Sequence, residues 1–236
     1  ILAYILCLYF TLSGFADMGT GLSRCFGMRF PASFSYPIFS GRIRHFAAGW
    51  LIQPVHWFRE YLTRPLSSRV RNKNVSKAIF VAVWALGGYW FGFSLGGMIW
   101  GALTGAAILT ENRLRNVRLI KSNGIFYTFI ITSFFAVFLS TDSVLDAFRY
   151  MWAMIGGNGI PADTLSGYLF RSYIVVILAA IYASTDLFAN TVQRVRSSRS
   201  GAVINVITPF VMPLLLMICT SVIAYTGISD AMIIHL

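Results

Sequence analysis

The sequence predicts an all-α fold: a polytopic helical membrane protein with broken or re-entrant helices and with amphipathic helices at the membrane surface. Of the 236 residues, 57% are hydrophobic and only 11% are charged, a composition typical of integral membrane proteins. None of the apolar runs alternates like a transmembrane β-strand. Five apolar runs have the length of a membrane-spanning helix or nearly so: 1–16, 78–110, 125–140, 168–185 and 202–225.

The chain begins inside an apolar run, at Ile1, without an initiating methionine or a signal-peptide pattern. We therefore expect residues 1–236 to form a single membrane-embedded domain that is the C-terminal part of a longer bundle.

Residues 19–74 are too polar to cross a membrane and too aromatic for a free linker. Aromatic residues such as Trp57 alternate here with Arg59 and Arg64. That pattern predicts an amphipathic helix in the headgroup layer, with these three residues at the cytoplasmic interface. We expect Pro65 to end this helix.

Residues 78–110 contain no charged side chain. As one helix they would be ~50 Å long at ~1.5 Å per residue, too long for one crossing of a ~30 Å hydrocarbon layer and too short for two. We therefore predict a hairpin that breaks inside the membrane. The spacing of its glycines allows close helix packing. We also expect the pairs Gly87–Gly88 and Gly96–Gly97 to unwind the backbone around a cavity.

The net charge of +11 comes from clusters that each lie beside an apolar run, at 59–77, 113–121 and 194–199. The positive-inside rule places these clusters in the cytoplasm. An even number of crossings must then separate them, which agrees with the hairpin and with spans at 125–140 and 168–185. Because no basic stripe is free of a membrane flank, the lipid bilayer is the expected partner and nucleic acid is not.

The cysteines and histidines show neither a disulfide framework nor the spacing of metal ligands. We expect no metal site. The cysteines are Cys7, Cys25 and Cys219, and the histidines are His45, His56 and His235.

Two blocks resemble a known family. Residues 9–37 read YFTLSGFADMGTGLSRCFGMRFPASFSYP, and residues 50–66 read WLIQPVHWFREYLTRPL. Both are similar to membrane-bound O-acyltransferases, in the branch that acetylates alginate and other surface polysaccharides and transfers D-alanine to teichoic acids. The likeness continues in the hairpin, at Trp90 with Gly92 and at Trp100-Gly101, and more weakly over residues 128–159. It covers nearly the whole chain, as the C-terminal half of a family member.

The sequence departs from the family at its histidines. The presumed catalytic histidine falls on Phe91, and two further family histidines fall on Leu51 and Thr104. Phenylalanine cannot bind a proton, and loss of a general base typically costs ~10² to 10⁴ in rate. No residue is therefore assigned as catalytic with certainty. His56, five positions after Leu51, is the candidate substitute, with an interfacial structural histidine as the alternative.

By the same resemblance, the hairpin and the first span frame the tunnel of the family. Asp17 is either a functional intramembrane acid or a structural partner of Arg24 or Arg29, or a helix cap. The residues expected to line the site are Asp17, Tyr89, Trp90, Phe91, Gly92, Ser94 and Thr104.

Two functions stay open. One is transfer of an acyl group, such as acetyl, to a cell-surface polysaccharide by a modified mechanism, with acyl-CoA or an acyl carrier as donor and no bound cofactor. The other is a non-catalytic binding or scaffold subunit of a membrane complex. A transporter or channel, the third class, would need ionisable residues at the break, and the hairpin has none.

The resemblance also implies a setting. It is a multi-pass protein of the bacterial cytoplasmic membrane, whose donor enters from the cytoplasmic side near residues 59–77. Envelope polysaccharide and other membrane or periplasmic acylation proteins are the implied partners.

Overall fold

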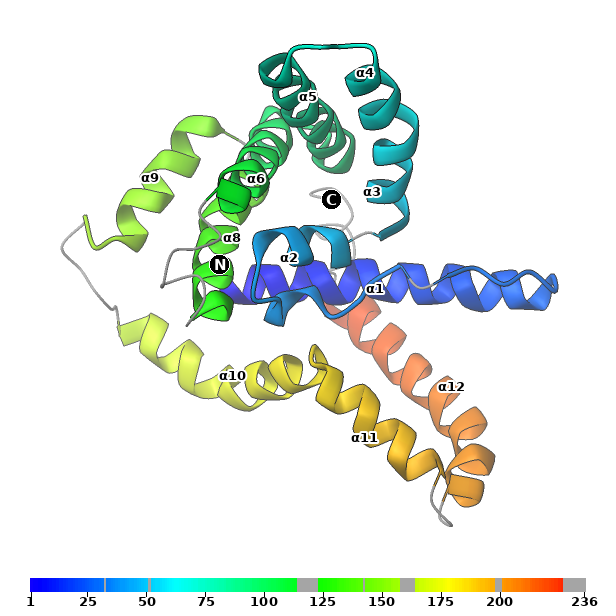
Figure 1. The fold of residues 1–236 in the computed structure, drawn as a ribbon. Coiled ribbons are helices and arrows are strands. Elements are labelled where there is room, and N and C mark those ends of the chain that lie inside the picture. The colour runs from blue at the N-terminus through cyan, green and yellow to red at the C-terminus, as the bar shows by residue number, and fades with distance from the viewer. Residues whose placement is uncertain are drawn as a thin grey trace. The chain divides into compact units, whose positions relative to one another are not determined.

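The computed structural model confirms the all-α class, since every regular element in the described residues is a helix (Figure 1). The described residues form two compact units, Ile1–Ser184 and Thr185–Leu236, and each is treated separately below. A single domain over residues 1–236 stays a prediction. The structure describes residues 1–31, 33–50, 52–113, 123–141, 143–157, 164–197 and 201–226.

Two helices of the described chain are long and apolar enough to cross a membrane, α1 (Leu2–Cys25) and α5 (Lys73–Gly92). The span predicted at 1–16 is confirmed, and its helix continues to Cys25. A shorter apolar helix, α8 (Gly124–Ser140), occupies the span predicted at 125–140. Helix α9 (Val144–Met154) and helix α10 (Thr164–Ala183) complete this unit.

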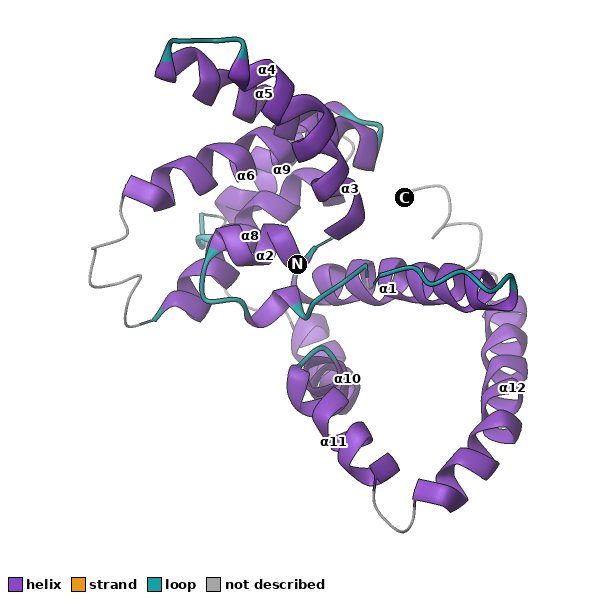
Figure 2. Ribbon diagram, turned by 45° about the vertical axis from the view of Figure 1, so that its right-hand side comes forward, coloured by secondary structure: helices purple, strands orange, loops and turns teal. Residues whose placement is uncertain are grey.

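The predicted hairpin is confirmed: α5 and α6 (Leu95–Arg113) pack against each other and are separated only by Phe93 and Ser94 (Figures 1 and 2). Phe93 ends α5 in the left-handed region, at φ +44°. The Ser94 hydroxyl oxygen then accepts a hydrogen bond from the Gly97 N–H at 3.0 Å. A serine in this position caps the first turn of a helix, so the break has a local cause.

The paired glycines do not unwind the backbone, so that prediction was wrong. All four lie within α5 or α6. Their lack of a side chain instead allows close helix contact, because a Cβ on Gly97 would lie 2.6 Å from the carbonyl oxygen of Gly88, and one on Gly96 would overlap the carbonyl oxygen of Phe138 in α8. The small-residue spacing is therefore used for packing.

Between α1 and the hairpin the chain forms short helices. After η1 (Pro37–Phe39) and α2 (Ile43–Gly49) come α3 (Ile52–Phe58), the π-helical turn η2 (Arg59–Thr63) and α4 (Arg64–Ser68). The last three follow one another without a gap and pack along α5.

Pro65 does not end this helical segment, which continues to Ser68, so that expectation was wrong. The proline stands in the first turn of α4, directly after the π-helical turn. Its missing N–H costs little there, because the regular hydrogen-bond pattern has already changed.

Helix α2 is fixed in place by buried contacts on two sides. Its Phe46 belongs to a cluster with residues of α1, and its Ile43 and Ala47 pack with Ile108 of α6. In addition, a buried carboxylate on α6, Glu111, accepts a hydrogen bond from the Arg44 N–H at 3.2 Å. These contacts hold α2 against the hairpin.

The second unit contains α11 (Asp186–Ser197) and α12 (Gly201–Thr226). The helix predicted at 202–225 is present as α12, and its apolar stretch is Val206–Ser221. Pro209 and Pro213 lie inside it.

Candidate functional site

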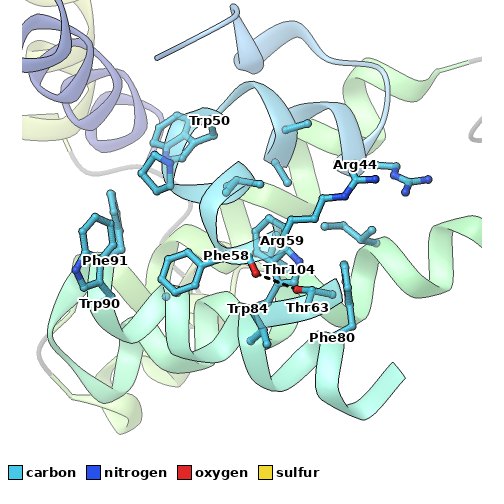
Figure 3. Close-up of a pocket in the computed structure, with 18 of the residues that line it drawn as sticks. Arg44, Trp50, Phe58, Arg59, Thr63, Phe80, Trp84, Trp90, Phe91 and Thr104 are labelled. Atoms are coloured by element: carbon cyan, nitrogen blue, oxygen red, sulfur yellow. Dashed lines mark hydrogen bonds between the residues drawn. The ribbon is translucent and has the colours of Figure 1, made fainter. Parts of the chain in front are cut away.

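A cavity of about 270 Å³ lies in the first unit, between α2, α3 and η2 on one side and the hairpin α5–α6 on the other (Figure 3). Its walls are mostly apolar, and eight of the residues that line it are aromatic, which suits an apolar ligand. The aromatic lining residues are Phe46, Trp50, Phe58, Phe80, Trp84, Trp90, Phe91 and Trp100.

Among the described residues that line the cavity, the only ionisable side chains are three arginines: Arg44, Arg59 and Arg64. Arg64 forms an ion pair with Glu60 at 2.6 Å. No such pair forms for Arg44 or Arg59 within the described ranges. Figure 3 shows Arg44 and Arg59 toward one end of the cavity, and Trp90 and Phe91 toward the other. The cavity is thus apolar along its walls and positively charged at one end.

The lining contains two hydroxyl groups, and both donate to backbone carbonyls. The Thr104 hydroxyl donates to the Trp100 carbonyl oxygen at 2.8 Å, and the Thr63 hydroxyl donates to that of Phe58 at 3.4 Å (Figure 3). Thr104 is only 2% exposed. No histidine, carboxylate, lysine, cysteine or tyrosine is among the described residues that line the cavity.

Phe91 lies in the cavity wall, where the resemblance places the reaction site. Its ring stacks on Trp100, with centroids 5.7 Å apart and planes 29° apart. It also packs against the core cluster that contains Trp50. Thr104 lines the same cavity, so two of the three positions where the resemblance expects a histidine face one space. The third, Leu51, lies outside the described residues.

Other residues expected at the site lie elsewhere in the fold. Trp90 lines the cavity, but Tyr89 and Gly92 do not. Ser94 is the cap of α6. Asp17 is an exposed residue of α1 that is not in the lining. In the described chain Asp17 forms no ion pair with Arg24 or Arg29.

The interfacial residues divide between two faces of the α3–η2 segment. Arg59 and Arg64 face the cavity. Trp57 is 52% exposed and stacks on Tyr61, with ring centroids 5.3 Å apart. His56 lies beside Trp57 in a shallow outer groove and is not part of the cavity lining. The role of His56 as a substitute base stays a prediction, and a test of it must take into account that His56 lies outside the cavity lining.

Sequence reasoning missed Arg44, Trp50 and Trp84 as site residues. A signal for the last was present, since Phe80, Trp84 and Phe91 recur at the spacing of one helix face. Arg44 and Trp50 come from α2 and the residue that follows it. Only tertiary packing brings them to the hairpin. Across the described residues, no group of three potential metal ligands comes together.

Fold and site together define an all-helical membrane protein that holds an aromatic cavity with arginines at one end. Comparison with curated proteins identifies relatives of known kind. The chain is 29% identical to a peptidoglycan O-acetyltransferase of Helicobacter pylori, over 70% of this chain and 32% of the relative. It is also 29% identical to a probable alginate O-acetylase AlgI of Pseudomonas syringae pv. tomato, over 79% of this chain and 37% of the relative. A probable alginate O-acetylase AlgI of Pseudomonas putida is 37% identical, over 48% of this chain and 23% of the relative.

The chain is therefore a homologue of these polysaccharide O-acetyltransferases, and the resemblance to membrane-bound O-acyltransferases is confirmed. It spans about a third of the length of the first two relatives. No protein-family model matches the chain, and no solved structure is significantly similar to it.

Proposed function

We propose that this chain provides the acyl-donor site of an O-acyltransferase that modifies an envelope polysaccharide. The protein would be a multi-pass component of the bacterial cytoplasmic membrane. The names of the relatives support the reaction class. The observation that carries the proposal is the cavity itself, apolar along its length, with Arg44 and Arg59 at one end.

An acyl thioester fits this distribution of charge. Acyl-CoA and the phosphopantetheine arm of an acyl carrier both join an acyl group to phosphate through a long linker. Arginine guanidinium groups bind phosphate through paired hydrogen bonds, so Arg44 and Arg59 would hold the phosphate end. The aromatic walls would keep water from the thioester.

In the proposed reaction, a sugar hydroxyl oxygen attacks the acyl carbonyl carbon. A C–O bond forms, the C–S bond of the thioester breaks, and the sulfur leaves as a thiol after it takes up the proton that the hydroxyl loses. The acceptor is envelope polysaccharide, delivered together with other membrane or periplasmic acylation proteins.

One observation favours a second candidate, a subunit that binds the donor without transferring the acyl group. Phe91 and Thr104 stand at family histidine positions and line the cavity. With no general base among the lining residues, transfer by this site alone is expected to be slower by ~10² to 10⁴.

Turnover decides between the two candidates. Full-length protein in lipid nanodiscs is given labelled acetyl-CoA and polysaccharide, as wild type and as Phe91→His, Phe91→Leu and His56→Ala. We expect weak transfer by wild type, faster transfer by Phe91→His, and no gain from Phe91→Leu, which changes the ring without adding a base. If Phe91→His transfers the acyl group and the wild type does not, the result would favour the second candidate, a subunit that only binds the donor. Loss of wild-type transfer in His56→Ala would make His56 the proton acceptor.

Donor binding is tested separately from turnover. We expect Arg59→Gln and Arg44→Gln each to weaken CoA binding by about 10- to 150-fold, because a charge-assisted hydrogen bond contributes ~1.5 to 3 kcal/mol. Arg69→Gln is the matched control, since Arg69 ends α4 outside the cavity lining. Wild-type protein that binds no CoA derivative or acyl carrier would refute the proposed function.

A further inference from the structure

Among the described residues that line the cavity, one buried side-chain donor has no hydrogen-bond acceptor. Trp50 is 5% exposed, and its indole Nε1–H has no acceptor among the described residues. Trp50 also lines the cavity. A buried tryptophan usually pairs its N–H, and an unpaired buried donor is costly. Among the described residues, this buried N–H therefore lacks one acceptor.

The indole is held rigidly. Its ring stacks on Phe46, with centroids 5.4 Å apart and planes 24° apart. Phe34 contacts it edge-on at 5.9 Å, and Tyr9 lies at 6.2 Å. Aromatic rings from α1, α2 and the loop between them surround the indole. They fix its position, and they therefore also fix the direction of its N–H. A fixed donor can recognise one acceptor atom without further ordering.

We propose that the Trp50 Nε1–H binds the carbonyl oxygen of the donor's acyl group. The inference rests on the proposed function and names the residue that recognises the thioester. Trp50 belongs to the cluster on which Phe91 packs, and in Figure 3 it lies on the side of Phe91, away from Arg44. A donor with its phosphates at the arginines would thus extend its acyl group toward Trp50.

This contact has a chemical consequence. When the hydroxyl attacks, the carbonyl oxygen gains negative charge, and a fixed N–H in a dry site stabilises that charge. No bond to Trp50 forms or breaks, and its proton stays on nitrogen. The interaction needs no proton acceptor at position 91. The hydrogen bond from Trp50 would therefore support slow acyl transfer. If transfer has been lost, the same hydrogen bond would support recognition of the donor.

The test compares acetyl-CoA with S-ethyl-CoA, a thioether of nearly the same shape that lacks the carbonyl oxygen. Binding is measured by calorimetry on the full chain in nanodiscs. We expect wild type to prefer acetyl-CoA by about 2- to 10-fold, the range that one neutral hydrogen bond supplies. Trp50→Phe should lose this preference and bind S-ethyl-CoA as wild type does. The control, Trp57→Phe, changes a tryptophan outside the cavity lining and should keep the preference.

A second readout is the spectrum of the wild-type protein, in which the ligand response needs no variant. In protein labelled with ¹⁵N-tryptophan, one indole N–H resonance should shift with acetyl-CoA and not with S-ethyl-CoA, and Trp50→Phe should remove that resonance. Equal affinities and equal spectra in wild type would make water the acceptor and overturn the inference, while the donor site would stand. A preference that persists in Trp50→Phe would also overturn it. Binding of neither compound would overturn the inference, and the proposed function would be refuted with it if an acyl carrier also fails to bind.

Discussion

Gly97→Ala tests whether the glycines of the hairpin serve close packing. The new Cβ would lie 2.6 Å from the Gly88 carbonyl oxygen, whereas ordinary contacts begin at 3.4 Å. Helices α5 and α6 must then separate by about 0.8 Å. Overpacking of this kind costs ~1 to 3 kcal/mol. The higher helix propensity of alanine returns ~0.5 to 1 kcal/mol, so we expect a net loss of up to about 2.5 kcal/mol.

Gly14→Ala is the matched control. Gly14 lies inside α1, and no neighbouring atom lies within 4 Å of the position that a Cβ would take there. The propensity gain is common to both variants, so the difference between their unfolding free energies isolates the helix contact. It should be about 1 to 3 kcal/mol, measured by denaturant unfolding in detergent and followed by circular dichroism. Two variants of equal stability would refute the close approach of α5 and α6.

Further predictions concern the hairpin tip and the anchor of α2. Phe93→Gly should raise the free energy of unfolding by about 1 kcal/mol, because Phe93 is left-handed and 73% exposed; a loss in thermal unfolding assays would contradict this. Ser94→Ala should lower it by about 1 kcal/mol through loss of the α6 cap, and an unchanged melting temperature would argue against the cap. Glu111→Ala should cost ~1 to 3 kcal/mol, because the Arg44 N–H loses its acceptor, whereas Glu111→Gln keeps an acceptor and should cost less. Equal losses in those two variants would show that the contact does not anchor α2.

Composition and apolar run lengths were enough to predict the helical class and the hairpin. The charge-free run is too long for one crossing and too short for two, and this length alone requires a break. The position of the break was less accessible. It depends on a left-handed Phe93 and on the Ser94 cap, and phenylalanine has no intrinsic preference for the left-handed region that a sequence would reveal.

The glycine pairs show how the same residues support two predictions. Adjacent glycines permit unwinding, and glycines four residues apart permit close packing. The register decides between them, because Gly88, Gly97 and Gly101 meet across the α5–α6 interface. That pairing depends on where the hairpin turns. Likewise, Arg44 and Trp50 reach the cavity only because α2 packs on α6, which no local pattern encodes.

At position 91, where the resemblance places a histidine, phenylalanine keeps one property of that residue and lacks another. Both side chains are flat rings, and the ring of Phe91 stacks on Trp100 and packs against the cluster that holds Trp50. Phenylalanine lacks the two ring nitrogens of histidine, and with them the ability to accept a proton. The ring at this position can therefore help to form the donor site even though it cannot accept a proton. Phe91→His alters the chemistry and nearly preserves the packing, whereas Phe91→Leu alters the packing and adds no chemistry. If Phe91→Leu weakens donor binding and Phe91→His does not, the ring contributes to the architecture of the cavity independently of catalysis.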